Sequence, residues 1–135
     1  MGRIIRILHL DSDPDTTWLL HQHLRHRGAR YIVQRVATLA EFARALDEGQ
    51  WHAILSDFRS PAASAADALS FLRTHDIDVP FVVLSSRLEE PEIAGIMHAG
   101  ADDCVDKDDL ARLVPVLDRE FRRHSPNRTH GTAAG

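Results

Sequence analysis

The sequence predicts an α/β fold in which a parallel β-sheet carries helices on both faces. Short apolar runs rich in Ile, Leu and Val alternate along the chain with longer stretches in which apolar residues recur every three or four positions. Continuous apolar runs are typical of strands covered on both sides, and the longer stretches are typical of amphipathic helices. This alternation repeats five times, which favours parallel strands joined by right-handed crossovers.

Strands are predicted where the apolar runs fall. Pro80 introduces the fourth run, and the fifth is a short run that follows Gly100. Each run is bounded by turn-forming or helix-starting residues, as expected for strands of a buried sheet. The predicted strands cover residues 4–10, 31–36, 51–56, 81–84 and 102–106.

Helices are predicted from their start and stop signals. Asp13-Pro14 opens the first helix, and Thr38 with Glu41 has the spacing of a capping box at the start of the second. Gly28 and Gly100 are C-terminal stops for the first and fourth helices. The predicted helices cover residues 14–27, 38–46, 65–74, 89–99 and, after a cap at Asp108 or Asp109, 110–121, where Pro115 predicts a kink or a restart.

Composition bounds the class of protein. The 135 residues are predicted to form one domain over residues 1–123, followed by a flexible tail or linker over residues 124–135. The single cysteine, Cys104, excludes an internal disulfide and a cysteine-based zinc site. No apolar run approaches the ~20 residues of a membrane span, and no secretory signal is visible, so we expect a cytoplasmic location and no membrane partner. A net charge of −4 argues against nucleic-acid binding by this domain.

The predicted topology brings polar residues together. A flavodoxin-like strand order, 2-1-3-4-5, is the common arrangement for a doubly wound sheet of this size, and ligands bind beyond the carboxyl ends of its strands. Asp11 follows the first strand and Asp57 ends the third, and these two strands are neighbours in that order. Asp11 and Asp57 should therefore face each other, with Ser85 and Lys107 beyond them.

Lys107 is the only lysine among sixteen Lys and Arg residues. Because arginine occupies every other basic position, this lysine at a strand end indicates a site that needs a compact positive charge. Neighbouring carboxylates repel unless a cation or a raised pKa relieves them, and Mg²⁺ suits a site made of oxygen ligands. Phosphoryl transfer to a carboxylate requires a set of functional groups of this kind, namely carboxylates, a metal ion, a hydroxyl and an ammonium group.

Four strand-end motifs resemble the receiver domain of bacterial two-component response regulators, in order and at matching spacing. The motifs are Ile-Leu-His-Leu-Asp11-Ser-Asp-Pro, Ala-Ile-Leu-Ser-Asp57-Phe-Arg-Ser-Pro61, Pro-Phe-Val-Val-Leu-Ser85-Ser and Gly-Ala-Asp-Asp-Cys-Val-Asp-Lys107, and the resemblance covers roughly residues 4–123.

The resemblance implies a role for each of these residues. Asp57 would accept a phosphoryl group from a histidine kinase or histidine phosphotransferase, Ser85 would bond that group, and Lys107 would neutralise one of its oxygens. Mg²⁺ would be held by Asp11, Asp57 and the backbone carbonyl of Arg59. The domain would then be a signalling module that assists its own phosphorylation and dephosphorylation and is not an enzyme acting on a separate substrate. The kinase, the output partner and a homodimer are left open.

Three positions depart from the family pattern, and one of them is Asp108, which follows Lys107 where the family commonly has proline. Ser12 stands where the family usually has a second acid that binds the metal, so Mg²⁺ should bind weakly unless Asp13 supplies a ligand. Cys104 stands where the family usually has a switch aromatic on the fifth strand, so coupling to an output surface should be weak or follow another route. Asp102 and Asp103 are interpreted as loop acids.

Two other functions compete with phosphoryl acceptance. A pseudo-receiver that binds partners without phosphorylation would explain Ser12 and Cys104. Asp11-Ser-Asp13 also has a superficial likeness to the Asp-x-Asp nucleophile motif of haloacid-dehalogenase-type phosphatases. That family has Thr or Val where Asp15 stands, and its acids and lysine follow the opposite order along the chain, so we rank this hypothesis last.

Overall fold

The computed structural model describes residues 3–24 and 29–134, with side chains described as far as His124. Strands and helices alternate throughout. The elements are β1 (Arg3–Leu10), α1 (Pro14–His23), β2 (Ala29–Val36), α2 (Leu39–Glu48), β3 (Ala53–Asp57), α3 (Ala65–Thr74), β4 (Phe81–Ser85), α4 (Glu90–Ala99), β5 (Asp103–Asp106), the 3₁₀ helix η1 (Lys107–Arg112) and α5 (Leu113–Ala134).

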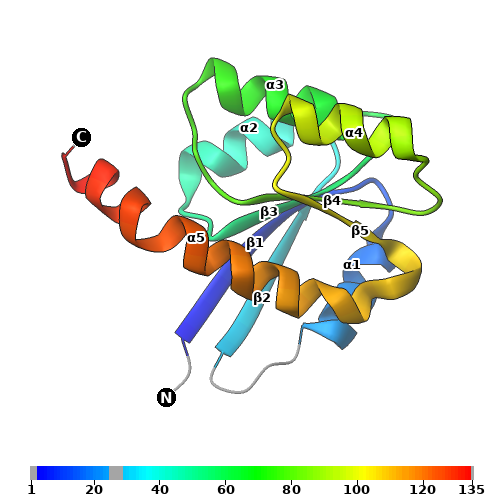
Figure 1. Cartoon of the computed structure of the whole chain (residues 1–135), viewed down its shortest axis with the longest axis horizontal. Coiled ribbons are helices and arrows are strands. Elements are labelled where there is room, and N and C mark those ends of the chain that lie inside the picture. Colours follow the sequence, from blue (N-terminus) through cyan, green and yellow to red (C-terminus); the bar gives the residue numbers. More distant parts are fainter. Residues whose placement is uncertain (1–2, 25–28, 135) are drawn as a thin grey trace.

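The five strands form one parallel sheet in the order β2-β1-β3-β4-β5 (Figure 1). This confirms the predicted doubly wound topology and its strand order. In the register of the sheet, Leu10 of β1 lies opposite Ser56 of β3, and Ser85 of β4 lies opposite Asp106 of β5. The carboxyl ends of the four strands β1, β3, β4 and β5 therefore meet along one edge.

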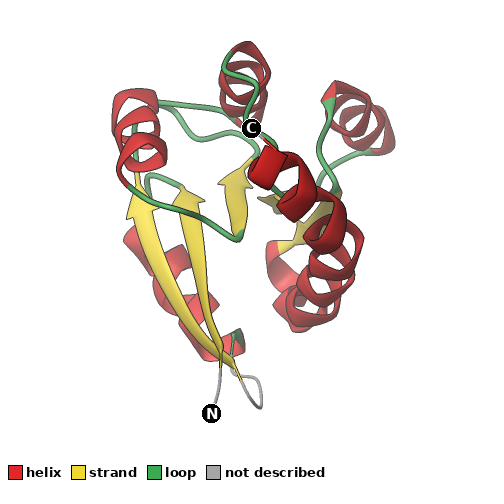
Figure 2. Ribbon diagram, turned by 90° about the vertical axis from the view of Figure 1, so that its left-hand side faces the viewer, coloured by secondary structure: helices red, strands yellow, loops and turns green. Residues whose placement is uncertain are grey.

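Helices cover the sheet on both faces, with α2, α3 and α4 on one side and α1 and α5 on the other (Figures 1 and 2). Each face has its own hydrophobic core. Phe42 of α2 and Leu69 of α3 pack with alternate strand residues such as Ile54 on the first face. Leu20 of α1 and Leu117 of α5 pack with the intervening strand residues on the second face. Both sides of the central strands are buried, which is why their sequences read as continuous apolar runs.

Helix starts follow the predicted capping chemistry at α2. The Thr38 hydroxyl accepts a hydrogen bond from the Glu41 amide at 3.1 Å, and the Glu41 carboxylate accepts from the Thr38 amide at 3.3 Å. A second capping box, between Ser64 and Asp67, begins α3.

None of the helices in residues 3–24 and 29–134 combines the length and the hydropathy that a membrane-spanning helix requires.

The end of the first helix differs from the sequence expectation. Helix α1 ends at His23, short of Arg27, because Leu24 leaves the helical conformation with φ −90° and ψ 38° and buries its side chain in the second core. The expected stop at Gly28 lies outside the described residues.

The last helix restarts, as Pro115 predicts. Asp109 has the non-helical angles φ −134° and ψ 50° inside η1, and α5 begins at Leu113, so Pro115 lies in its first turn, where a missing N–H costs little. Helix α5 runs on to Ala134, but side chains after His124 lie outside the described set, and the flexible tail stays a prediction. His124, the first residue of that predicted tail, is a buried residue of α5.

Replacing Thr38 with Ala should lower the free energy of unfolding by about 1 kcal/mol, because the substitution leaves the Glu41 amide without its capping acceptor. Thr74→Ala is the matched control, since the Thr74 hydroxyl donates to the Ser70 carbonyl at the end of α3 and caps no free amide. Urea denaturation of both variants measures the difference. Equal losses in the two variants would show that the capping contact contributes nothing specific.

Candidate functional site

The carboxyl edge of the sheet brings three of the predicted residues into direct contact. The ammonium Nζ of Lys107 lies 3.0 Å from Asp57 Oδ1 and 3.2 Å from Asp11 Oδ2. Asp11 directly follows β1, Asp57 ends β3, and Lys107 directly follows β5. The strand order thus places one cation between two carboxylates that lie 46 positions apart in the sequence.

The two carboxylates differ in exposure. The Asp11 side chain is 2% exposed, whereas the Asp57 side chain is 16% exposed. Asp11 is also held in place, because its Oδ1 accepts the backbone amide of Asp13 at 2.8 Å. A reactant arriving from solvent therefore meets Asp57, and Asp11 is the fixed partner behind it.

The surroundings of Asp11 favour its charged form. Burial raises the pKa of Asp11, but the nearby His9 imidazole, the Asp13 amide and the Lys107 charge together outweigh burial and hold the pKa at about 2. His9 is fully buried, with its Nε2 at 3.6 Å from Asp11 Oδ2 and its Nδ1 at 2.9 Å from the Thr17 hydroxyl. His9 is not among the site residues predicted from the sequence, although a histidine inside a continuous apolar strand was the available signal.

The same pairing acts on Lys107. Burial lowers the pKa of Lys107, but its hydrogen bond to Asp57 and the charges of Asp11 and Asp57 raise it above the ordinary value. The side chain thus stays an ammonium group, as a residue that neutralises an anionic oxygen must.

The residues after β1 and β4 have other partners. Ser12 is exposed, and Asp13 caps α1 by accepting the Asp15 amide at 2.9 Å. Ser85 is buried at the end of β4, and its hydroxyl donates to the Ser86 carbonyl at 3.4 Å, a long contact. That length leaves the hydroxyl weakly held.

The loop after β3 is tied to α4 by Arg59. The Arg59 guanidinium forms an ion pair with Glu92 and lies 5.0 Å from the centre of the Phe58 ring. This side chain points its charge at α4, so only the backbone of Arg59 is available for the predicted metal contact.

Cys104 of β5 is half-buried against the first core. Burial, followed by the charge of Asp103, raises the pKa of the Cys104 thiol to about 11. The thiol is therefore protonated at neutral pH and behaves as a small packing residue.

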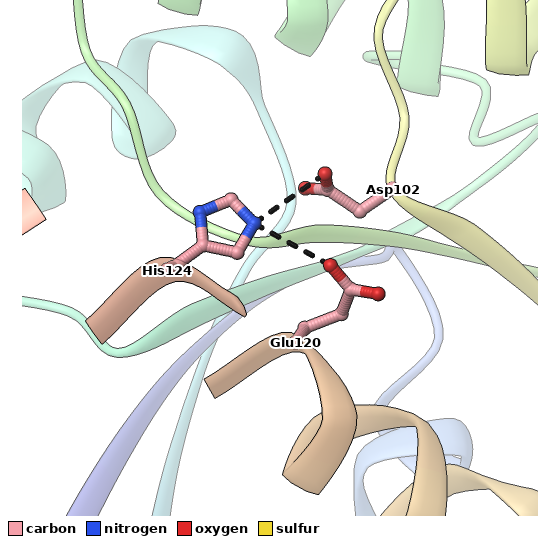
Figure 3. A group of neighbouring side chains, drawn as sticks. All are labelled: Asp102, Glu120 and His124. Atoms are coloured by element: carbon pink, nitrogen blue, oxygen red, sulfur yellow. Dashed lines mark ion pairs between the residues drawn. The ribbon is translucent and has the colours of Figure 1, made fainter. Parts of the chain in front are cut away.

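A second polar cluster lies at the opposite edge of the sheet, and sequence reasoning missed it. Asp102 precedes β5, and Glu120 and His124 lie one turn apart on α5 (Figure 3). Glu120 falls three positions after Leu117 on the apolar face of that helix, so an acid at a buried position was the signal. Asp102 lies in the turn before β5, consistent with its interpretation as a loop acid, and its side chain accepts the Phe81 amide at 2.8 Å, whereas Asp103, interpreted in the same way, is the first residue of β5.

Comparison with known proteins identifies the family. The model of the response regulator receiver domain matches residues 7–118. The chain belongs to the response regulator receiver domain family. It is 33% identical over 125 residues to the transcriptional regulatory protein PrrA of Mycobacterium tuberculosis, covering 92% of this chain and 53% of PrrA. It is 31% identical over 106 residues to the C4-dicarboxylate transport transcriptional regulatory protein DctD of Pseudomonas aeruginosa, covering 76% of this chain and 22% of DctD. The chain thus spans about half the length of PrrA.

Solved structures agree on the fold of this receiver domain. The receiver domain of the sensor histidine kinase PA1611 from Pseudomonas aeruginosa, which has a magnesium ion coordinated in its active-site cleft, is 25% identical with a TM-score of 0.72, over 90% of this chain and 98% of that one. A two-component response regulator from Clostridium difficile is 19% identical with a TM-score of 0.76, over the same shares of 90% and 98%, and shows the fold alone.

The depressed pKa of Asp11 should make stability fall in acid. A carboxyl group whose folded pKa is about 2 against an ordinary 3.8 stabilises the fold fully above the ordinary value and loses that contribution as pH falls through about 2. The shift corresponds to about 2 kcal/mol in the free energy of unfolding. Asp11→Asn should flatten this dependence between roughly pH 4 and 2, measured by urea denaturation in metal-free buffer.

Asp47→Asn, at an exposed position of α2, is the control for that measurement. It should leave the acid dependence as in the parent protein. An Asp11→Asn variant with the parent slope would mean that other carboxyl groups dominate acid unfolding.

Proposed function

We propose that this receiver domain accepts a phosphoryl group on Asp57 from the phosphohistidine of a histidine kinase or histidine phosphotransferase. The observation that carries the proposal is the position of Lys107 Nζ, 3.0 Å from Asp57 Oδ1 and 3.2 Å from Asp11 Oδ2, at the carboxyl edge of the sheet. Membership of the receiver family, whose members signal in two-component systems, supports it. No residue of this chain identifies the cognate kinase or the output partner.

The transfer is a displacement at phosphorus. A carboxylate oxygen of Asp57 attacks, an oxygen–phosphorus bond forms, the nitrogen–phosphorus bond of the donor breaks, and the histidine nitrogen leaves with that electron pair. Negative charge on the transferred group is neutralised by Lys107, already in place beside Asp57. The long contact of the Ser85 hydroxyl to Ser86 leaves it able to turn toward a phosphoryl oxygen.

The donor set fits Mg²⁺. Asp11 and Asp57 offer carboxylate oxygens beside each other, and the backbone carbonyl of Arg59 adds a third hard ligand, with Asp13 as a further candidate. When bound, Mg²⁺ supplies additional neutralisation of the phosphoryl charge. Ser12 gives a hydroxyl in place of a carboxylate, and Asp13 already caps α1, so we propose that Mg²⁺ binds weakly.

A pseudo-receiver is the second candidate function. Ser12 and Cys104 support it, because the first weakens the metal site and the second is too small to transmit a change by ring rotation. Such a protein would bind its partners in the same way with or without phosphate on Asp57. The phosphorylation measurement below separates this candidate from the first, and turnover of a generic phosphomonoester would be the sign of a phosphatase instead.

Asp57→Asn should abolish phosphorylation by acetyl phosphate or phosphoramidate in the presence of Mg²⁺, because it removes the attacking oxygen. Intact-protein mass spectrometry should show one added phosphoryl group on the parent protein and none on the variant. Asp47→Asn, exposed on α2, is the control and should label as the parent does. Labelling that persists in Asp57→Asn would place the chemistry on another residue, and no labelling of the parent would favour the pseudo-receiver.

Ser12→Asp should tighten Mg²⁺ binding by about 1 to 3 kcal/mol, the range of a charge-assisted contact. Calorimetric titration of Mg²⁺ into both proteins measures this change. Ser70→Asp, which adds the same charge at an exposed position of α3, should bind Mg²⁺ as the parent does. Equal affinities for Ser12→Asp and the parent would show that Asp13 already supplies the missing ligand.

A further inference from the structure

Three metal-ligating side chains converge at the amino edge of the sheet, away from Asp57 and Lys107. The turn before β5 contributes Asp102, and α5 contributes Glu120 and His124 at i and i+4. Glu120 is fully buried and His124 is 8% exposed. Among the residues whose side chains the structure describes, this is the one group of three such side chains whose ligand atoms all lie within 4.8 Å of one another.

The ligand atoms face a common point. Figure 3 shows one ring nitrogen of His124 directed at both carboxylates while the other points away. His124 Nε2 lies 3.5 Å from Asp102 Oδ1 and 3.4 Å from Glu120 Oε1. A tetrahedral zinc site with bonds of about 2.0–2.2 Å has edges of roughly 3.3–3.5 Å between neighbouring ligand atoms. The two separations match the edges of such a tetrahedron, and they exceed the length of a charge-assisted hydrogen bond.

Each carboxylate presents one oxygen to His124 and is also held by hydrogen bonds from neighbouring groups. Asp102 Oδ2 accepts the Phe81 amide at 2.8 Å, which leaves Oδ1 toward His124. Glu120 Oε2 accepts from Arg123 Nη1 at 3.1 Å and from Arg119 Nε at 3.4 Å, and Oε1, which faces His124, also accepts from Arg123 Nη1 at 3.3 Å. Ligating carboxylates in metalloproteins are held in this way by outer hydrogen bonds that fix their orientation.

Charge and ligand type select the ion. One imidazole nitrogen with two carboxylate oxygens suits Zn²⁺ and similar transition ions, whereas Mg²⁺ prefers oxygen ligands in octahedral geometry. The guanidinium groups of Arg119 and Arg123 beside Glu120 offset part of the carboxylate charge. Three protein ligands leave the fourth position of a tetrahedron to water.

We propose that Asp102, Glu120 and His124 form a binding site for a divalent transition ion of the Zn²⁺ type. The site is separate from the phosphorylation site, since the length of β5 lies between Asp102 and Lys107. A bound ion would join α5 to the amino end of β5, because Asp102 precedes β5 and the other two ligands lie on α5.

Binding is tested with the full chain, free of any affinity tag, in the presence of excess Mg²⁺ to occupy the carboxyl edge. Co²⁺ or Zn²⁺ should bind in one equivalent, Co²⁺ should give the visible absorption of a tetrahedral ion, and Zn²⁺ should raise the melting temperature. His124→Ala and Asp102→Asn should weaken this binding by more than roughly 100-fold, beyond the 10–100-fold loss typical of outer-shell changes. His98→Ala, at an exposed position of α4, is the control and should bind as the parent does.

A second measurement uses the unmodified protein, so that a variant that fails to fold cannot obscure the result. Two-bond proton–nitrogen spectra of the histidine rings should show Zn²⁺ shifting Nε2 of His124. No stoichiometric binding by the parent, equal binding by His124→Ala, or a shift confined to other histidines would each overturn the proposal. The phosphorylation of Asp57 is read out separately, and its failure would leave this site intact.

Discussion

The ion-pair triad of Asp11, Asp57 and Lys107 is the constraint around which the functional edge is organised. Two carboxylates brought together at neighbouring strand ends repel each other, and a compact ammonium between them makes the arrangement tolerable. The sheet assembles the three groups by placing β1 beside β3, with β5 two strands farther along. The charge arrangement therefore depends on the topology, because the strand order brings Lys107 to both carboxylates.

Burial then gives the two carboxylates different tasks. Asp11 is enclosed, receives a backbone amide and has a strongly lowered pKa, so it is a fixed negative charge. Asp57 is the more exposed of the pair and lies at the end of a strand whose other residues are buried. The fixed charge of Asp11 and the accessible carboxylate of Asp57 form a preorganised arrangement of the kind that electrostatic catalysis needs. No large movement of these side chains is required when the phosphoryl group arrives.

Much of the fold could be predicted from local sequence pattern. The continuous apolar runs indicate the buried strands, and apolar residues at every third or fourth position indicate the helices. Helix α3 has the bounds predicted from its sequence, and the strand order followed from alternation and handedness. The contacts of Asp11 and Asp57 with Lys107 could be predicted from the sequence, because the ends of neighbouring parallel strands meet at one edge of the sheet. The end of α1 could not be predicted, since it depends on Leu24 reaching the core. The cluster of Asp102, Glu120 and His124 depends on the path of α5 across the sheet, which no local pattern specifies.

That cluster also explains how α5 is positioned. Apolar packing by Leu113 and Leu117 fixes which face of the helix meets the sheet but is weakly directional along the helix axis. Arg119 bonds both Asp103 and Glu120, and His124 faces Asp102, so polar groups of α5 meet carboxylates at the start of β5 in one register. Buried ionic groups contribute little net stability, yet an axial shift of α5 would separate Arg119 from Asp103 and His124 from Asp102, because these two pairs join the helix to the start of β5. The polar network thus selects one axial position for α5 from those that hydrophobic contact alone would allow.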